Sequence, residues 1–209
     1  MLSGISALLG ALRALERDNG QAVLATVVKV EGSAYRRPGA RMLIPLYGGT
    51  VGTISGGCLE SEVAKKAWWL TDGGEAVIRR YSTATQDDDD DQDAALTFGL
   101  GCNGTVHVLL ERHSAEKPLA VLKLLRLVRE SGQAGAVATV IGSYRNARVR
   151  VGERLYLHPS LSDGSCLLDS ALDAEVRADL QRTLTDSRSS LRSYCLLYTS
   201  PSPRDKRQS

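Results

Sequence analysis

Residues 21–45 read QAVLATVVKVEGSAYRRPGARMLIP, and the architecture of the chain follows from this stretch. Its first ten residues, 21–30, are β-branched and apolar, which is the composition of a buried strand. Gly32–Ser33 marks a turn, and Arg41–Pro45 predicts a second, shorter strand. A third strand, Thr50–Ile54, follows a Gly-Gly pair, so we expect the second and third strands to form a hairpin.

Helical periodicity lies on both sides of this strand region. Before it, apolar residues recur at helical spacing in Leu2–Leu15, and Asn19–Gly20 supplies a left-handed stop. After it, Cys58–Leu70 carries apolar residues at helical intervals, which predicts a helix opened by the cysteine. Ala115–Glu130 and Asp169–Leu184 predict two further helices.

The second half of the chain repeats the first half weakly. Strands are also predicted at residues 75–82 and at Thr105–Leu110. The similar segments are Ala134–Ile141 with Ala22–Val28, and Val151–Pro159 with Pro38–Pro45. Several strands with three or four helices, and adjacent strands joined as hairpins, indicate an α/β fold with a mixed sheet, flanking helices and a weak internal β-rich repeat.

Composition places the chain among ordinary globular proteins. It has 209 residues, of which 43% are hydrophobic and 24% charged, enough for one good core or two small ones. No apolar run approaches the roughly 20 residues of a membrane span, and no export signal is recognisable. The formal charge of +2 is carried by the last nine residues. We therefore expect a cytoplasmic protein with neither a membrane nor a nucleic-acid partner.

Cysteines and histidines give no metal-ligand spacing. The four cysteines, Cys58, Cys102, Cys166 and Cys195, form no CxxC pair, so we expect free thiols. His107, His113 and His158 share no ligand spacing, and the five-aspartate run Asp87–Asp91 lacks the spacing of a calcium loop. No metal site is expected.

Residues 195–209, CLLYTSPSPRDKRQS, change abruptly to a Ser/Pro/Arg-rich composition. They resemble the translation of a sequencing-library adapter, with a natural disordered tail as the alternative. We expect three parts: residues 1–113, a continuation at 114–194, and a non-native tail at 195–209, with the natural reading frame interrupted near residue 194.

The first of three chemical motifs is GSAYRRPGARM, residues 32–42. Its glycines permit close backbone approach, and Arg36, Arg37 and Arg41 supply guanidinium groups that suit phosphate or carboxylate. The motif indicates an anion-binding loop, and the alternative is a solvated turn with arginines on its rim.

The second motif is GTISGGCLE, residues 52–60. Ser55, Gly56 and Gly57 precede the predicted helix, so their amides are expected to be free to meet an anion at the positive end of the helix. Cys58 in the first turn is then expected to have a lowered pKa. A buried cysteine acting as a small hydrophobic residue is the alternative.

The third motif is FGLGCNG, residues 98–104. The glycines around Cys102, including Gly101, predict an accessible second thiol. A tight turn with an incidental cysteine is the alternative.

In this order and at these separations, the three motifs resemble the N-terminal domain of the XdhC/CoxI family, strongly over residues 8–113 and more loosely over 114–192. The resemblance implies a non-enzymatic accessory protein that binds the molybdenum cofactor, protects it while a cysteine desulfurase supports its sulfuration, and passes it to an apo molybdenum hydroxylase of the xanthine dehydrogenase or CO dehydrogenase type. The resemblance is also compatible with a homodimer.

The resemblance also implies a cofactor site. Its residues are Arg36, Arg37, Arg41, Ser55, Gly56, Gly57, Cys58, Gly101 and Cys102. The alternative function is a thiol-dependent sulfurtransferase using Cys58 and Cys102, although neither motif contains a histidine base. Family members usually continue into a Rossmann-type domain, and the chain has no strand–GxGxxG–helix unit that would indicate NAD binding.

Overall fold

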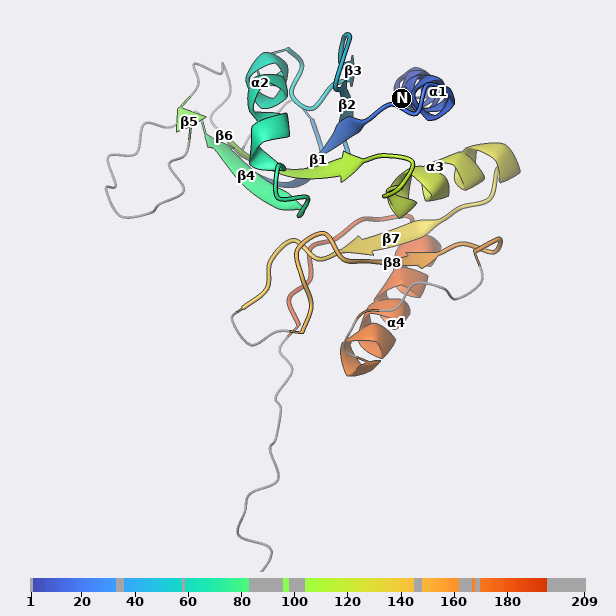
Figure 1. Cartoon of the computed structure of the whole chain (residues 1–209). Coiled ribbons are helices and arrows are strands. Elements are labelled where there is room, and N and C mark those ends of the chain that lie inside the picture. The colour runs from blue at the N-terminus through green and yellow to red at the C-terminus, as the bar shows by residue number, and fades with distance from the viewer. Residues whose placement is uncertain are drawn as a thin grey trace, which may run out of the picture.

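The computed structural model describes residues 2–32, 36–57, 59–82, 96–97, 104–144, 148–161, 167 and 170–194. Along the chain, the helices are separated by groups of two or three strands (Figure 1). In order they are α1 (Leu2–Arg17), β1 (Ala22–Gly32), β2 (Arg41–Pro45), β3 (Val51–Gly52), α2 (Glu60–Leu70), β4 (Val77–Ser82), β5 (Leu96–Thr97), β6 (Gly104–His113), α3 (Ala120–Ser131), β7 (Ala136–Thr139), β8 (Arg154–Leu157) and α4 (Ser170–Asp186).

Two sheets are present among the described residues. The larger sheet has the strand order β3-β2-β1-β6-β4-β5, and the smaller one pairs β7 with β8. The neighbours in the larger sheet are antiparallel except β4 and β5, which are parallel. The predicted mixed α/β fold, with helices flanking a mixed sheet, is confirmed.

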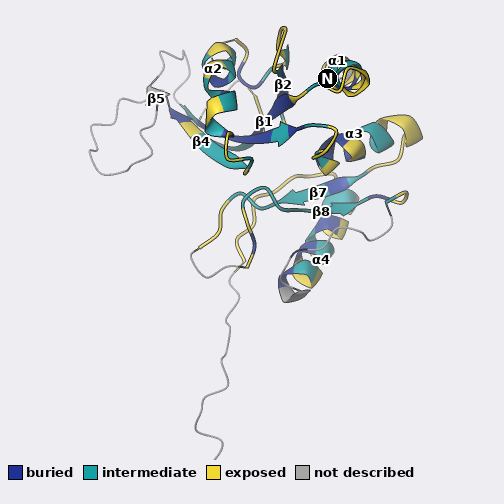
Figure 2. Ribbon diagram, in the orientation of Figure 1, coloured by how far each residue is buried: buried dark blue, intermediate teal, exposed yellow. Residues whose placement is uncertain are grey.

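The sequence of β1 explains its central place. Val23, Ala25 and Val27 pack in the cluster that includes α2, whereas Ala22 and Leu24 pack in the cluster that includes α1 and α3. Both faces of the strand are therefore buried, as its continuous apolar run predicts. The buried residues of the sheet are dark in Figure 2. We call the side of the sheet under α2 the α2 face, and the other side the opposite face.

The smaller sheet lies against the opposite face, and α4 covers its far side (Figure 1). Ala136 and Leu155 point to α4 in a separate hydrophobic cluster, while Tyr156 packs with the cluster that contains α1 and α3. β7 and β8 pair antiparallel as β1 and β2 do, so the second half contains the kind of hairpin that the predicted β-rich repeat requires.

Several predicted boundaries need correction. Helix α2 begins at Glu60, after Leu59 as N-cap, and not at Cys58. Helix α3 begins at Ala120 and not at Ala115, because Leu119 is extended (φ −75°, ψ 116°) and the residue before Pro118 is disfavoured in a helix. The predicted left-handed stop after α1 is confirmed at Asn19, with φ of 49°. The aspartate run Asp87–Asp91 lies outside the described residues.

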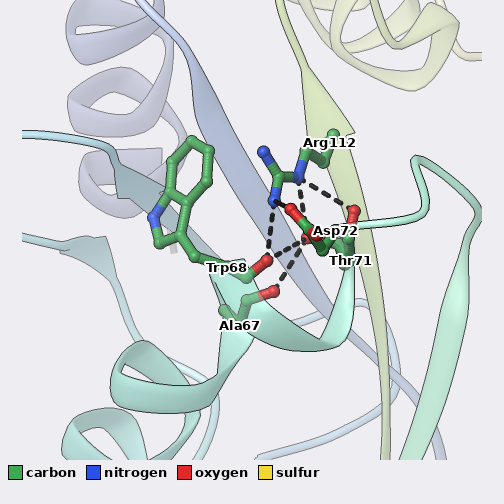
Figure 3. A network of polar contacts seen from close by, with 5 residues as sticks. All are labelled: Ala67, Trp68, Thr71, Asp72 and Arg112. Atoms are coloured by element: carbon green, nitrogen blue, oxygen red, sulfur yellow. Dashed lines mark hydrogen bonds and ion pairs between the residues drawn. The ribbon is translucent and has the colours of Figure 1, made fainter.

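Arg112 of β6 fastens the C-terminal end of α2 to the sheet (Figure 3). Its Nε donates to the carbonyl of Thr71 at 2.9 Å, its Nη2 donates to the carbonyl of Trp68 at 2.7 Å, and its guanidinium lies 4.6 Å from the centre of the Trp68 ring. A cation at the last carbonyls of a helix complements the helix dipole. Trp68 thus anchors the helix to the core, whereas Trp69 is 75% exposed.

No helix in the described part of the chain is long and apolar enough to cross a membrane.

Candidate functional site

The turn before α2 closes around the carboxylate of Glu60. Glu60 Oε1 accepts hydrogen bonds from the hydroxyl of Thr53 (2.5 Å) and from the amides of Ile54 (3.0 Å), Ser55 (2.9 Å) and Gly56 (3.1 Å). Glu60 Oε2 accepts from the hydroxyl of Ser55 (2.5 Å) and the amide of Gly57 (2.9 Å). The side chain that follows the turn therefore organises the turn.

This arrangement corrects the expectation of free amides at Gly56 and Gly57, because both donate to Glu60. Burial acts to raise the pKa of Glu60, but hydrogen bonds from Ser55 and Thr53 outweigh it and hold that pKa well below its ordinary value. The carboxylate is charged at neutral pH and occupies the position that a bound anion was expected to take. Cys58 lies outside the described residues, so its lowered thiol pKa stays a prediction.

The three arginines of the first motif separate into two environments. Arg36 and Arg37 are exposed on the segment that leads to β2. Arg41 begins β2, where its Nη1 donates to the carbonyl of Gly39 at 2.9 Å. The loop is therefore held at its base by Arg41 and presents Arg36 and Arg37 at its surface.

Arg41 points away from the Ser55–Gly57 turn. In β2, Met42 packs with the α2 cluster, and Leu43 packs on the opposite face. Because Arg41 is two residues before Leu43 in the same strand, its side chain lies on the same face as that of Leu43. Burial lowers the pKa of Arg41, the charge of Arg154 lowers it further, and Glu111 acts to raise it. The structure therefore does not bring the Arg41 guanidinium together with Ser55, Gly56 and Gly57.

The backbone of the first motif nevertheless contacts both of the other motifs, one at each of its ends. Gly32, which begins the first motif, pairs with Gly104, which ends the third. Thr53 of the second motif donates its amide to the carbonyl of Arg41 at 3.1 Å. Segments far apart in sequence thus emerge from neighbouring strand ends. Cys58, Gly101 and Cys102 lie outside the described residues, and their roles stay predictions.

Sequence reasoning missed a buried ion pair beneath the sheet. Arg154 of β8 binds the carboxylate of Glu111 of β6 through both terminal nitrogens, with Nη1 at 2.5 Å from Oε1. Their side chains are only 7% and 5% exposed. The signal was present, because Glu111 interrupts the apolar alternation of its strand, but a charge in a strand does not identify its partner.

The histidines serve local structure. His113 Nδ1 accepts the amide of Leu119 at 3.2 Å, and His158 Nδ1 accepts the amide of Ser160 at 3.1 Å. Burial lowers the pKa of His107 and of His113. Within the described ranges, no three or more His, Cys, Asp or Glu residues gather as a metal site.

Comparison with known proteins agrees with this geometry. The model of the XdhC and CoxI family matches residues 15–82, which include the first two motifs and the Glu60 turn. This segment belongs to the XdhC and CoxI family.

Two relatives match longer stretches of the chain than the 68 residues of the family segment. A probable xanthine dehydrogenase subunit of Bacillus subtilis (strain 168) is 42% identical over 106 residues, 51% of this chain and 31% of that protein. The molybdenum cofactor insertion chaperone PaoD of Escherichia coli (strain K12) is 36% identical over 115 residues, 55% of this chain and 34% of that protein. The chain therefore spans about a third of the length of these relatives.

A solved structure supports the fold. The crystal structure of a xanthine dehydrogenase from Bacillus halodurans superposes with a TM-score of 0.52 and 29% sequence identity, covering 76% of this chain and 45% of that one. The shared fold thus includes more of the chain than the family segment.

Proposed function

We propose that this chain takes part in the maturation of a molybdenum hydroxylase, by binding the molybdenum cofactor as cargo and supporting its sulfuration and insertion. The relatives carry the names of a molybdenum cofactor insertion chaperone and of a xanthine dehydrogenase subunit. The partners under this proposal are the apo-hydroxylase and a cysteine desulfurase, and the role is that of a carrier and not of a catalyst.

The observation that carries the proposal is that the backbone of the first motif contacts both of the other motifs. The Gly32–Gly104 pair places the first and third motifs at adjacent strand ends, and the second begins beside Arg41. Guanidinium groups, glycine-lined backbone and thiols suit an anionic ligand that contains phosphate and sulfur.

Each group has a role in the proposal. Arg36 and Arg37 bind the phosphate of the cofactor, and Arg41 holds the base of their loop. Cys58 and Cys102 lie near the sulfur ligands of the metal. The Ser55–Gly57 turn, fixed by Glu60, gives the backbone a shape that is set before the ligand arrives, which lowers the cost of binding.

The test is cofactor retention. The chain is purified without oxygen from cells that make the cofactor, and bound molybdenum and pterin are measured for wild type, Cys58→Ser, Cys102→Ser and the double variant. Cys195→Ser in the predicted non-native tail is the matched control. We expect wild type and the control to retain the cofactor. We expect the affinity of the double variant for the cofactor to be about tenfold lower, which corresponds to about 1.4 kcal/mol of binding free energy.

Two outcomes would contradict the proposal. Wild type free of both molybdenum and pterin would remove cofactor binding, and unchanged retention in the double variant would remove the thiols from the site. A persulfide on Cys58 that turns over without bound pterin would identify a sulfurtransferase instead.

A further inference from the structure

Arginines of the two sheets point toward each other in the layer between them. The smaller sheet lies against the opposite face of the larger one, where Tyr156 of β8 packs with Leu43 of β2 (Figure 1). Arg41, two residues before Leu43, lies on that same face of β2. Arg154, two residues before Tyr156, reaches Glu111 on the same face of β6. Both guanidinium groups therefore lie between the sheets.

The strand register places Thr26 between these arginines. Thr26 of β1 pairs directly with Arg41 on one side and with Leu109 of β6 on the other. Glu111 is two residues beyond Leu109, so it is a diagonal neighbour of Thr26, a distance of about 7–8 Å on one face of a sheet. Arg154 binds Glu111 from the smaller sheet through both terminal nitrogens. Thr26 thus stands between the strand that carries Arg41 and the carboxylate that holds Arg154.

The charges of this group do not balance. The Glu111–Arg154 pair is almost completely buried, with side chains 5% and 7% exposed. In the described part of the chain Arg41 forms no ion pair, and its Nη1 donates to the carbonyl of Gly39. Glu153 alternates to the α4 side of the smaller sheet. Two guanidinium groups and one carboxylate therefore leave a surplus of one positive charge.

The two arginines lie within electrostatic range of each other. Burial lowers the pKa of Arg41, the charge of Arg154 lowers it further, and the charge of Glu111 acts to raise it. Like charges disfavour each other's charged form when they are close, and more strongly where little water screens them. The surplus charge therefore belongs to one group of side chains and not to two separate ones.

Three hydrogen-bond donors of this group have no acceptor among the described residues. They are Nε of Arg41, Nε of Arg154 and the hydroxyl of Thr26, and all three atoms are buried. Thr26 as a whole is only 7% exposed. Because buried polar groups in native proteins are almost always hydrogen-bonded, these donors indicate an acceptor that the described side chains do not provide.

We infer that Arg41, Arg154 and Thr26 bind one small monovalent anion of halide size between the two sheets. An anion accepts from all three donors and neutralises the surplus charge, whereas a water molecule leaves that charge uncompensated. Packed sheets lie only about 10 Å apart, so the layer admits an ion and not a cofactor. The inference does not depend on the proposed function, because these groups face away from the Ser55–Gly57 turn.

The test is the chlorine NMR linewidth of chloride in solutions of the full chain, titrated at an ionic strength held constant with sodium gluconate. Wild type is compared with Arg41→Gln and Thr26→Val. Arg129→Gln, which removes an exposed charge at the end of α3, is the matched control for net charge. We expect saturable broadening from one site in wild type, an affinity about tenfold weaker in Arg41→Gln and in Thr26→Val, and a change within about twofold in the control.

Urea unfolding in the same buffers is the second measurement. Because the site needs both sheets in place, chloride should raise the unfolding midpoint of wild type and of the control more than that of Thr26→Val. If Arg41→Gln does not unfold cooperatively, Thr26→Val decides alone, since it keeps the shape of the side chain. No saturable broadening in wild type would overturn the inference, as would a chloride affinity in Thr26→Val equal to that of the control.

Discussion

Replacing Glu60 by glutamine is expected to destabilise the protein by about 2–4 kcal/mol. Six hydrogen bonds converge on the carboxylate, four at Oε1 and two at Oε2. An amide oxygen can keep the first four. The side-chain NH₂ group of the glutamine then replaces Oε2, so the backbone amide of Gly57 loses its acceptor. The Ser55 hydroxyl, which donated to Oε2, must instead accept a hydrogen bond from this NH₂ group.

The size of the effect follows from these losses. An unsatisfied donor costs about 1–3 kcal/mol, and hydrogen bonds to a charged acceptor are worth about 1.5–3 kcal/mol against about 1 kcal/mol for neutral ones. One lost bond and several weakened bonds give the expected range, because contributions that share one acceptor do not add fully.

The measurement is urea unfolding followed by tryptophan fluorescence at several pH values. The pKa of Glu60 lies below its ordinary value in the folded state. Its contribution is therefore complete above the unfolded pKa of about 4.3 and is lost as pH falls through the folded-state pKa. The free energy of unfolding of wild type should approach that of Glu60→Gln in acid.

The matched control is Glu62→Gln in the same helical turn, where Glu62 forms an ion pair with Lys66 at 2.6 Å. We expect a change within about 0.5 kcal/mol for this control. A loss in Glu60→Gln no larger than in the control, or a difference from wild type that does not narrow in acid, would contradict this account of the Glu60 turn.

Three further changes test the framework by urea unfolding. Arg154→Met should lower the free energy of unfolding by about 3–5 kcal/mol, because it leaves Glu111 buried without its partner. Adding Glu111→Leu should recover part of this loss. Equal stability of Arg154→Met and wild type would contradict a buried ion pair. Arg112→Ala should cost about 2–3 kcal/mol through the lost helix cap and ring contact, with Arg112→Lys recovering less than half, and a neutral alanine variant would argue against the cap. Gly52→Ala places a Cβ against the carbonyl oxygen of Arg41 at a φ of 99°, so it should lower the free energy of unfolding by more than about 2 kcal/mol. A Cβ at Gly57 meets open space, and Gly57→Ala is opposed only by the φ of 124°, so it should cost about 1–2 kcal/mol. A larger loss in Gly57→Ala than in Gly52→Ala would contradict the close approach at Gly52.

Most elements could be predicted because their signals are local. The apolar run of β1, the bounds of β2 and the left-handed Asn19 are readable from a few neighbouring residues. The wrong predictions concern helix starts. The start of α2 depends on how Glu60 closes the turn before it, and the start of α3 depends on the extended Leu119 after Pro118.

The order of residues alone reveals the three motifs and the repeat. It also reveals the family segment that contains two of these motifs. Three features of polar side chains became visible only in the folded chain. Glu60 accepts hydrogen bonds from the amides of the Ser55–Gly57 turn, Arg41 faces away from that turn, and Glu111 pairs with Arg154. This difference arises because apolar periodicity follows from each element's own backbone, whereas the partner of a polar group is whichever donor or acceptor the packing of distant strands brings within about 3 Å.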